Sequence, residues 1–142
     1  MTTVNDITLN SGDVALEASA RRRGHAIEVT LTAAIPHGVH IESHAPSDPF
    51  LIPTTVEVEG LEAATVDYPE PVHKDIGAAL GPPGVLVLVY EGTVRFAIRG
   101  RARRGLDAVR GELRYQPCVR GTCLPPRSAS WSAPLEAEEA AT

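Results

Sequence analysis

Apolar and polar residues alternate along short segments through most of the chain, a pattern typical of half-buried β-strands. In the segment 25–32, Ile27, Val29 and Leu31 fall on one face of a strand and polar residues fall on the other. The same reading of the whole sequence predicts strands at 14–18, 25–32, 39–42, 55–60, 64–68, 85–90, 93–98, 109–115 and 129–133.

Turn-forming residues separate these strands about every ten positions. The Arg-Arg-Arg-Gly stretch at 21–24 predicts a turn, and the arginine-rich stretch at 99–105 predicts a solvated hairpin loop. Residues 69–84 contain four prolines and three glycines and predict a long loop, which in a compact domain is usually functional or disordered. Eight or nine short strands with almost no helix predict an all-β protein, an antiparallel β-sandwich.

The length and the charge of the chain further narrow the possible classes of protein. The 142 residues fit one domain with a sizeable core, which we place at 12–135. A disordered or extended N-terminus, 1–11, and an acidic tail or linker, 136–142, flank it. No apolar run approaches the roughly 18 residues of a membrane span, and the first residues lack the basic and apolar regions of a signal peptide, so we expect neither in this chain. A net charge of −5 is a poor match for nucleic acid, so we expect no such partner.

The two cysteines of the chain, Cys118 and Cys123, carry the candidate chemistry. A disulfide across a turn would stabilise the fold by only about 2 kcal/mol in the chain-entropy model, because the loop is so short. A structural zinc site wants four ligands, and a spacing of four residues between cysteines is longer than usual. Thiol–disulfide exchange needs a close pair in which one sulfur attacks a partner and the other resolves the mixed disulfide. A stapling disulfide and a redox pair both remain open on these residues alone.

The surroundings of the pair resemble a known family. Tyr115-Gln116-Pro117-Cys118 followed by Cys123-Leu124-Pro125-Pro126 resembles the YQ-x-C…C-x-P-P signature of the N-terminal domain of DsbD, the bacterial thiol:disulfide interchange protein. Weaker matches at 47–54, 68–69 and 90–92 follow in the same order, so the resemblance covers about 12–135. This chain has four residues between its cysteines, whereas a known member of the family has five.

The resemblance implies an immunoglobulin-like β-sandwich in the periplasm or another extracytoplasmic space. It also implies a thiol:disulfide oxidoreductase without a cofactor, with Cys118 and Cys123 as the catalytic pair. Such a domain takes electrons from a thioredoxin-like donor domain, which is supplied through a membrane-embedded partner domain. It passes them to oxidised periplasmic proteins, such as disulfide isomerases and thioredoxins of cytochrome c maturation.

The family has a cap loop that covers the cysteine pair and opens for the partner. By order along the chain, this loop falls near 67–75, with Asp67, Tyr68 and Glu70 as the nearest counterparts of the family's acidic and aromatic cap residues. A carboxylate there would disfavour a thiolate while the cap is closed and could accept its proton. Tyr68 and Tyr115 are candidate apolar walls of the site or plain packing residues.

Two further predictions concern charge and metal. Arg120, between the cysteines, could favour a thiolate, although a solvated turn residue is the plainer interpretation. Cys123 is our choice for the sulfur that joins the partner, since it follows the turn. His37, His40 and His44 lie close together in sequence, but without a full ligand set we interpret them as surface or hydrogen-bonded histidines and expect no metal site.

The alternative function is a non-catalytic immunoglobulin-like interaction module with a structural disulfide.

Overall fold

The computed structural model describes residues 12–46, 50–75 and 86–135, which form strands and turns. No helix within these ranges could cross a membrane. In chain order the strands are β1 (Ala15–Arg23), β2 (Ala26–Ala34), β3 (Val39–Glu42), β4 (Thr55–Glu59), β5 (Leu61–Asp67), β6 (Val72–Asp75), β7 (Leu86–Tyr90), β8 (Thr93–Ala102), β9 (Ala108–Tyr115), β10 (Pro117–Val119), β11 (Thr122–Cys123) and β12 (Arg127–Pro134).

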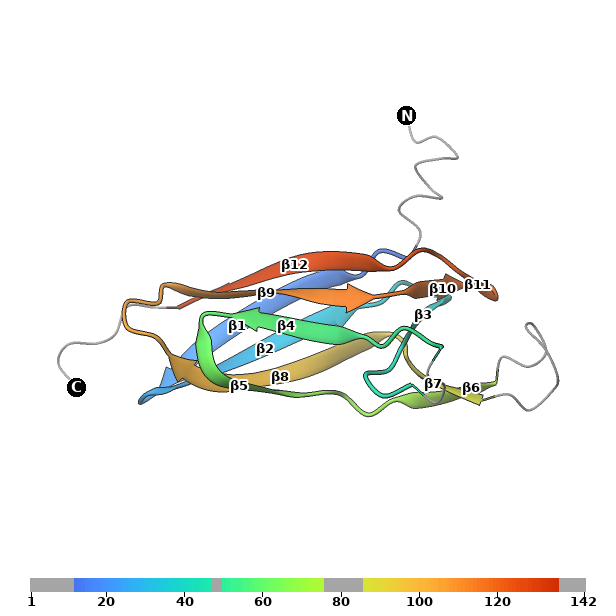
Figure 1. The fold of residues 1–142 in the computed structure, drawn as a ribbon. Helices are drawn as coiled ribbons and strands as arrows, with labels where there is room; N and C mark the ends of the chain where they lie inside the picture. The colour runs from blue at the N-terminus through green and yellow to red at the C-terminus, as the bar shows by residue number, and fades with distance from the viewer. Residues whose placement is uncertain (1–11, 47–49, 76–85, 136–142) are drawn as a thin grey trace, which may run out of the picture.

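The strands form an antiparallel β-sandwich, as the sequence predicts. One sheet has the order β1-β2-β8-β5 and another has the order β12-β9-β4. Figure 1 shows β12, β9 and β4 lying over the first sheet, with the shorter strands at one end of the sandwich. These short strands form a third sheet in the order β11-β10-β3-β7-β6, and it carries both cysteines.

The alternation read from the sequence points the expected side chains into the core. Ile27, Val29 and Leu31 of β2 are buried, and Phe96 and Ile98 face them from the neighbouring strand β8. Burial of an aliphatic or aromatic side chain contributes roughly 1.5–3 kcal/mol, so these two central strands supply much of the stability of the sandwich.

Two predicted turns lie inside strands instead. β1 runs to Arg23, which pairs with Ala26, so the arginines of the predicted turn at 21–24 belong to a strand and only its end turns. β8 likewise continues through Arg101 to Ala102, so the predicted hairpin loop at 99–105 begins too early. In β8 the exposed Arg99 and Arg101 flank the less exposed Gly100, and their long side chains leave the sheet on its solvent side. In β1 the exposed Arg21 and Arg23 flank the half-buried Arg22, which donates a hydrogen bond to the carbonyl of Leu106 (3.2 Å).

The predicted long loop at 69–84 is wrong in one part, since β6 (Val72–Asp75) pairs with β7 inside it. Proline residues precede this strand, which has four residues and lies at the edge of its sheet. Prolines are compatible with the start of an edge strand, because they have no amide hydrogen to donate to a neighbouring strand. The rest of the loop, the N-terminal segment 1–11 and the tail 136–142 lie outside the described residues, apart from 69–71.

Candidate functional site: the Cys118–Cys123 hairpin

The two cysteines face each other across a small hairpin at one end of the sandwich. Cys118 of β10 is the register partner of Cys123 of β11, and the two form a disulfide with their Cα atoms 3.9 Å apart. The amide of Leu124 donates a hydrogen bond to the carbonyl of Pro117 (2.8 Å), which holds the base of the hairpin. The spacing of four residues is therefore what a two-residue turn between directly opposed cysteines requires.

The turn itself has an unusual residue. Arg120 and Gly121 have φ angles of 51° and 78°, the pair of positive values that defines a type I′ turn. Asparagine and glycine are the usual residues at these positions, because a side chain in the left-handed region costs about 1–2 kcal/mol. Arg120 is exposed, which agrees with the interpretation as a solvated turn residue.

Replacing Arg120 by asparagine is expected to raise the free energy of unfolding of the disulfide form by about 0.5–1 kcal/mol, since asparagine enters the left-handed region at lower cost. Urea unfolding followed by circular dichroism measures the change. Arg120→Ala is the matched control, because it removes the charge and keeps the backbone cost. Equal stabilisation in both variants would show that charge, not turn geometry, is responsible.

The two sulfurs differ in their access to solvent. Cys118 is 1% exposed, whereas Cys123 lies on the exposed side of the hairpin at the edge of its sheet. Thiol–disulfide exchange requires the attacking sulfur to reach the disulfide along its axis, so only an accessible sulfur can take part first. The arrangement therefore gives a reachable sulfur, Cys123, and a protected one, Cys118.

Two buried polar residues of β3 stand beside the protected sulfur. His40 is the register partner of Cys118 across the β10–β3 pair, and Glu42, two positions on, shares its face of the strand. One ligand atom each of His40, Glu42 and Cys118 lies within 4.8 Å of the other two. Nε2 of His40 is 3.9 Å from Oε2 of Glu42, too long for a direct hydrogen bond.

Burial shifts the pKa values of both His40 and Glu42. His40 is 8% exposed and Glu42 is 3% exposed, and Oε1 of Glu42 has no hydrogen-bond partner among the described residues. Burial raises the pKa of Glu42 to about 7. Burial also lowers the pKa of His40, with a further lowering from the charge of Lys74 and an opposing effect of Glu91. The unpaired carboxyl oxygen is an exception to the rule that buried polar groups are hydrogen-bonded, as are Oγ of Ser43 and Nε1 of Trp131.

The sequence did not single out Glu42, and it interpreted His40 as surface or hydrogen-bonded. In an isolated strand, the alternation of 39–42 puts these polar residues on the solvent side. Here β3 lies between β10 and β7 in the sheet, and all four of its residues are buried. Buried polar residues on an inner strand leave no periodic signal, so only the tertiary structure reveals them.

The tyrosines predicted near the pair have structural contacts. Tyr115 is buried in the core, and its hydroxyl accepts a hydrogen bond from the amide of Val14 (3.1 Å). The hydroxyl of Tyr68 accepts one from the amide of Val56 (3.0 Å), and its ring stacks on His44 with centroids 3.7 Å apart. These contacts support the packing interpretation for both tyrosines.

The acidic cap candidates lie in the segment that follows β5. Asp67 ends β5 and pairs with Ala97 of β8. Glu70 is exposed; burial raises the pKa of the Tyr90 hydroxyl, and the charge of Glu70 adds a smaller effect in the same direction. The described contacts join neither carboxylate to Cys118 or Cys123. Their role as a cap thus stays a prediction, and the carboxylate that does lie beside Cys118 is Glu42.

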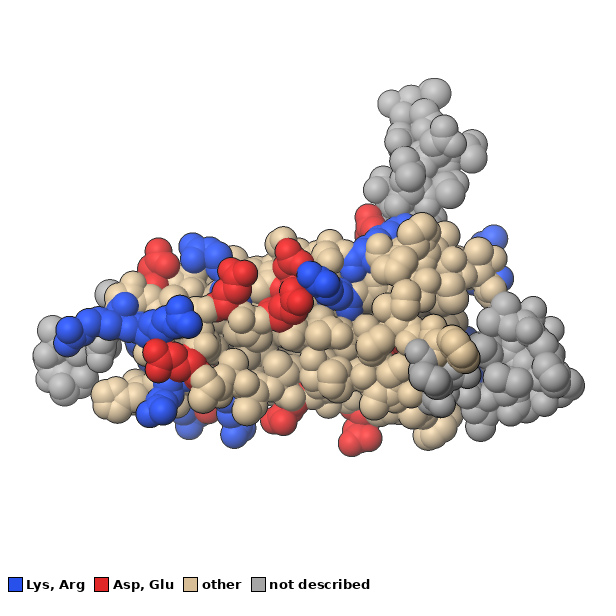
Figure 2. All heavy atoms as spheres, viewed as in Figure 1, with Lys and Arg blue, Asp and Glu red and all other residues tan. Residues whose placement is uncertain are grey.

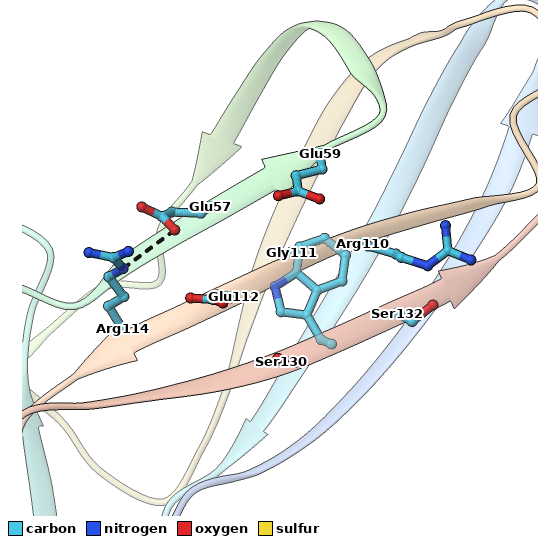
Figure 3. Close-up of a pocket in the computed structure, with 9 residues that line it drawn as sticks. Glu57, Glu59, Arg110, Gly111, Glu112, Arg114, Ser130 and Ser132 are labelled. Atoms are coloured by element: carbon cyan, nitrogen blue, oxygen red, sulfur yellow. Dashed lines mark ion pairs between the residues drawn. The ribbon is translucent and has the colours of Figure 1, made fainter.

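A second hollow, on the surface of the β12-β9-β4 sheet, contains neither cysteine. Figure 3 shows Gly111 of β9 in this groove among charged and hydroxyl side chains from all three strands. Its volume is about 610 Å³, and an ion pair between Arg114 and Glu57 (3.4 Å) crosses part of it. The second arginine of the groove, Arg110, pairs with Asp107 outside the groove (3.8 Å), so both arginines of the lining have ion-pair partners within the chain.

Solved structures with a similar fold are those of N-terminal domains of ScsB and DsbD. The N-terminal periplasmic domain of ScsB from Proteus mirabilis matches with a TM-score of 0.66 at 15% identity, over 94% of this chain and 49% of that one. This chain therefore spans about half the length of the ScsB structure. The reduced N-terminal domain of DsbD from Neisseria meningitidis matches with a TM-score of 0.50 at 14% identity, over 94% of both chains.

A third structure, the complex between the DsbD and PilB N-terminal domains of Neisseria meningitidis, has a TM-score of 0.47 at 14% identity, over 83% of this chain and 81% of that one. No protein-family model matches the chain, and no curated protein matches its sequence. The expected immunoglobulin-like sandwich is confirmed, and the resemblance to DsbD N-terminal domains is confirmed at the level of the fold.

Proposed function

We propose that this chain is a thiol–disulfide exchange domain that passes reducing equivalents from a thioredoxin-like donor to oxidised extracytoplasmic proteins. The observation that carries the proposal is the asymmetric disulfide at the edge of a sheet, with Cys123 exposed and Cys118 buried beside it. A bond meant only as a staple would stabilise the fold by about 2 kcal/mol at this loop length, a small gain for a domain with an extensive core.

The exchange proceeds in two displacements. A donor thiolate attacks Sγ of Cys123, the bond to Cys118 breaks, and Cys118 leaves as a thiolate that takes a proton. The second donor thiolate then attacks the donor's own sulfur in the mixed disulfide and releases Cys123. The donor leaves as a disulfide, and this chain has gained two electrons and two protons.

Transfer to the acceptor reverses the roles. The Cys123 thiolate attacks the disulfide of the oxidised protein, and Cys118 then resolves the mixed disulfide and restores the bond to Cys123. Because Cys118 is the register partner of Cys123, it reaches the sulfur without movement of the strands. The proposal needs no cofactor in this chain.

The setting of the hairpin also supports docking of another protein. Figure 2 shows interspersed acidic and basic side chains along one face and a mostly uncharged stretch of the described surface toward the end with β10 and β11. Apart from the exposed Arg120 in its turn, the hairpin adjoins a surface with few charges, which suits a succession of partners because each has little charge pattern to match. Disulfide isomerases, thioredoxins of cytochrome c maturation and a membrane-embedded donor domain are the partners we propose, in a periplasmic location.

The reduction potential of the Cys118–Cys123 pair tests the proposal. We expect a value in the range of about −180 to −270 mV, in which thioredoxin-like proteins exchange electrons. Equilibration of the full chain with glutathione and dithiothreitol buffers, followed by thiol alkylation, gives the value. The double variant Cys118→Ala/Cys123→Ala supplies the baseline for alkylation.

The alternative function, an interaction module with a permanent disulfide, predicts a different result. Structural disulfides usually lie below about −300 mV. A potential well below that value would overturn the exchange proposal in favour of the interaction module.

A further inference from the structure

Four potential metal ligands line up on one face of three adjacent strands. Cys123 of β11 is opposite Cys118 of β10, and Cys118 is opposite His40 of β3. Glu42 occupies the next position of β3 on the same side. Register partners in a sheet have their side chains on the same face, and the ligand atoms of Cys118, His40 and Glu42 come together in one cluster. The sulfur of Cys123 adjoins this cluster through its bond to the sulfur of Cys118.

We propose that the reduced chain binds one Zn²⁺ ion through Cys118, Cys123, His40 and Glu42. The donor set of two sulfurs, one nitrogen and one oxygen is of the kind that zinc takes in proteins. The two cysteines alone are too few ligands for the ion. The other two ligands, His40 and Glu42, come from β3, which is distant in sequence from the hairpin.

The distances are close to those of a tetrahedral site. Zinc–ligand bonds of about 2.0–2.3 Å place neighbouring ligand atoms about 3.3–3.8 Å apart. The atoms of His40, Glu42 and Cys118 lie within 4.8 Å of one another, and the His40–Glu42 distance is 3.9 Å. Side-chain rotations that shorten these distances by up to about 1 Å would give these three ligand atoms tetrahedral spacing without any change in the strands. Reduced Cys123, on the neighbouring strand, is the fourth ligand that the proposal adds.

The unpaired oxygen of Glu42 is a second, independent observation at this place. Glu42 is 3% exposed, its Oε1 has no hydrogen-bond partner among the described residues, and the carboxyl group lies beside the sulfur and the imidazole. A bound cation would supply that oxygen with a partner.

The disulfide and the metal exclude each other. In the form described here, the sulfurs are bonded to one another and have no thiolate charge to give to a cation. Reduction frees both sulfurs, and zinc then displaces the thiol protons into solvent. The site needs only that the disulfide can be reduced, so it does not rest on exchange with any protein partner.

Metal titration of the full chain tests the site. The protein is reduced with a phosphine, which leaves no thiol in solution, and Zn²⁺ is added in competition with a chromogenic chelator. We expect one equivalent to bind with a dissociation constant of about 1 μM or lower. The disulfide form is expected to bind at least about a hundredfold more weakly, because it lacks both thiolates.

Variants separate the four-ligand site from binding by the two thiols alone. Glu42→Gln and His40→Ala are each expected to weaken binding at least about tenfold, and His37→Ala, at an exposed histidine of the preceding turn, is expected to leave it unchanged. Zinc binding by the wild type that is no tighter than in Cys118→Ser/Cys123→Ser would overturn the site. So would wild-type affinity in both Glu42→Gln and His40→Ala.

Cobalt gives a second readout that does not depend on affinities. Co²⁺ in the reduced wild type is expected to show the visible absorption of a tetrahedral ion together with thiolate charge transfer. Near-ultraviolet circular dichroism of each variant confirms that it is folded. A spectrum of six-coordinate cobalt without thiolate bands in a folded, reduced chain would contradict the proposal.

Discussion

A chain with Cys123 as its single cysteine is expected to react with a small aromatic disulfide about a hundredfold faster than a chain with Cys118 alone. Cys123 is exposed, whereas Cys118 is 1% exposed and reacts only when the hairpin opens. An opening that costs about 3 kcal/mol slows a reaction by roughly this factor. Release of the coloured thiol from the reagent measures the two rates in Cys118→Ala and Cys123→Ala.

The same variants identify the sulfur that joins a protein partner. Cys118→Ala is expected to accumulate a mixed disulfide with a thioredoxin-like protein that lacks its own resolving cysteine, and Cys123→Ala is expected to give little. In denaturant the two variants should react at similar rates, which controls for differences in intrinsic thiol reactivity. A trap that forms chiefly through Cys118 would reverse the assignment and require the hairpin to open before every exchange.

The sandwich could be predicted from the sequence because the central strands show a clear alternation of apolar and polar residues. In β2 and β8 the apolar residues recur at every second position, and the structure buries these same residues, apart from the half-buried Val94. The arginines of 21–23 and 99–101 misled the prediction, since a run of charge resembles a turn. Long charged side chains are nevertheless compatible with a strand whose outer face is solvated.

Only the part of the site whose residues lie close together in the sequence could be predicted. Cys118 and Cys123 are separated by a turn, so their spacing and the glycine between them already indicate that they meet. Glu42 and His40 reach the pair through the β10–β3 register, which joins residues about 78 positions apart in the chain. Nothing in the local sequence pattern determines which strand lies beside the hairpin. The buried carboxylate beside Cys118 could therefore be identified only from the structure.

Replacing Gly111 by alanine is expected to lower the free energy of unfolding by about 3 kcal/mol or more, the upper range for overpacking. A Cβ at this position would lie 1.9 Å from the carbonyl oxygen of Glu57 and 2.5 Å from Cζ2 of Trp131. Gly111 pairs with Val58 of β4 on one side and with Trp131 of β12 on the other, as the position of Gly111 in Figure 3 illustrates. Relief of the clash must therefore shift a neighbouring strand.

Gly24→Ala is the matched control for this substitution. Gly24 lies in the β1–β2 turn with φ +63° and has no atom within 4 Å of the added Cβ, so only the backbone cost of about 1–2 kcal/mol applies. Urea unfolding followed by far-ultraviolet circular dichroism avoids a signal from Trp131 itself. A loss of stability in Gly111→Ala no greater than in Gly24→Ala would show that β4 and β12 can separate around Gly111 at little cost. A larger loss would identify the β12-β9-β4 sheet as a rigid platform from which β9 leads directly into the cysteine hairpin.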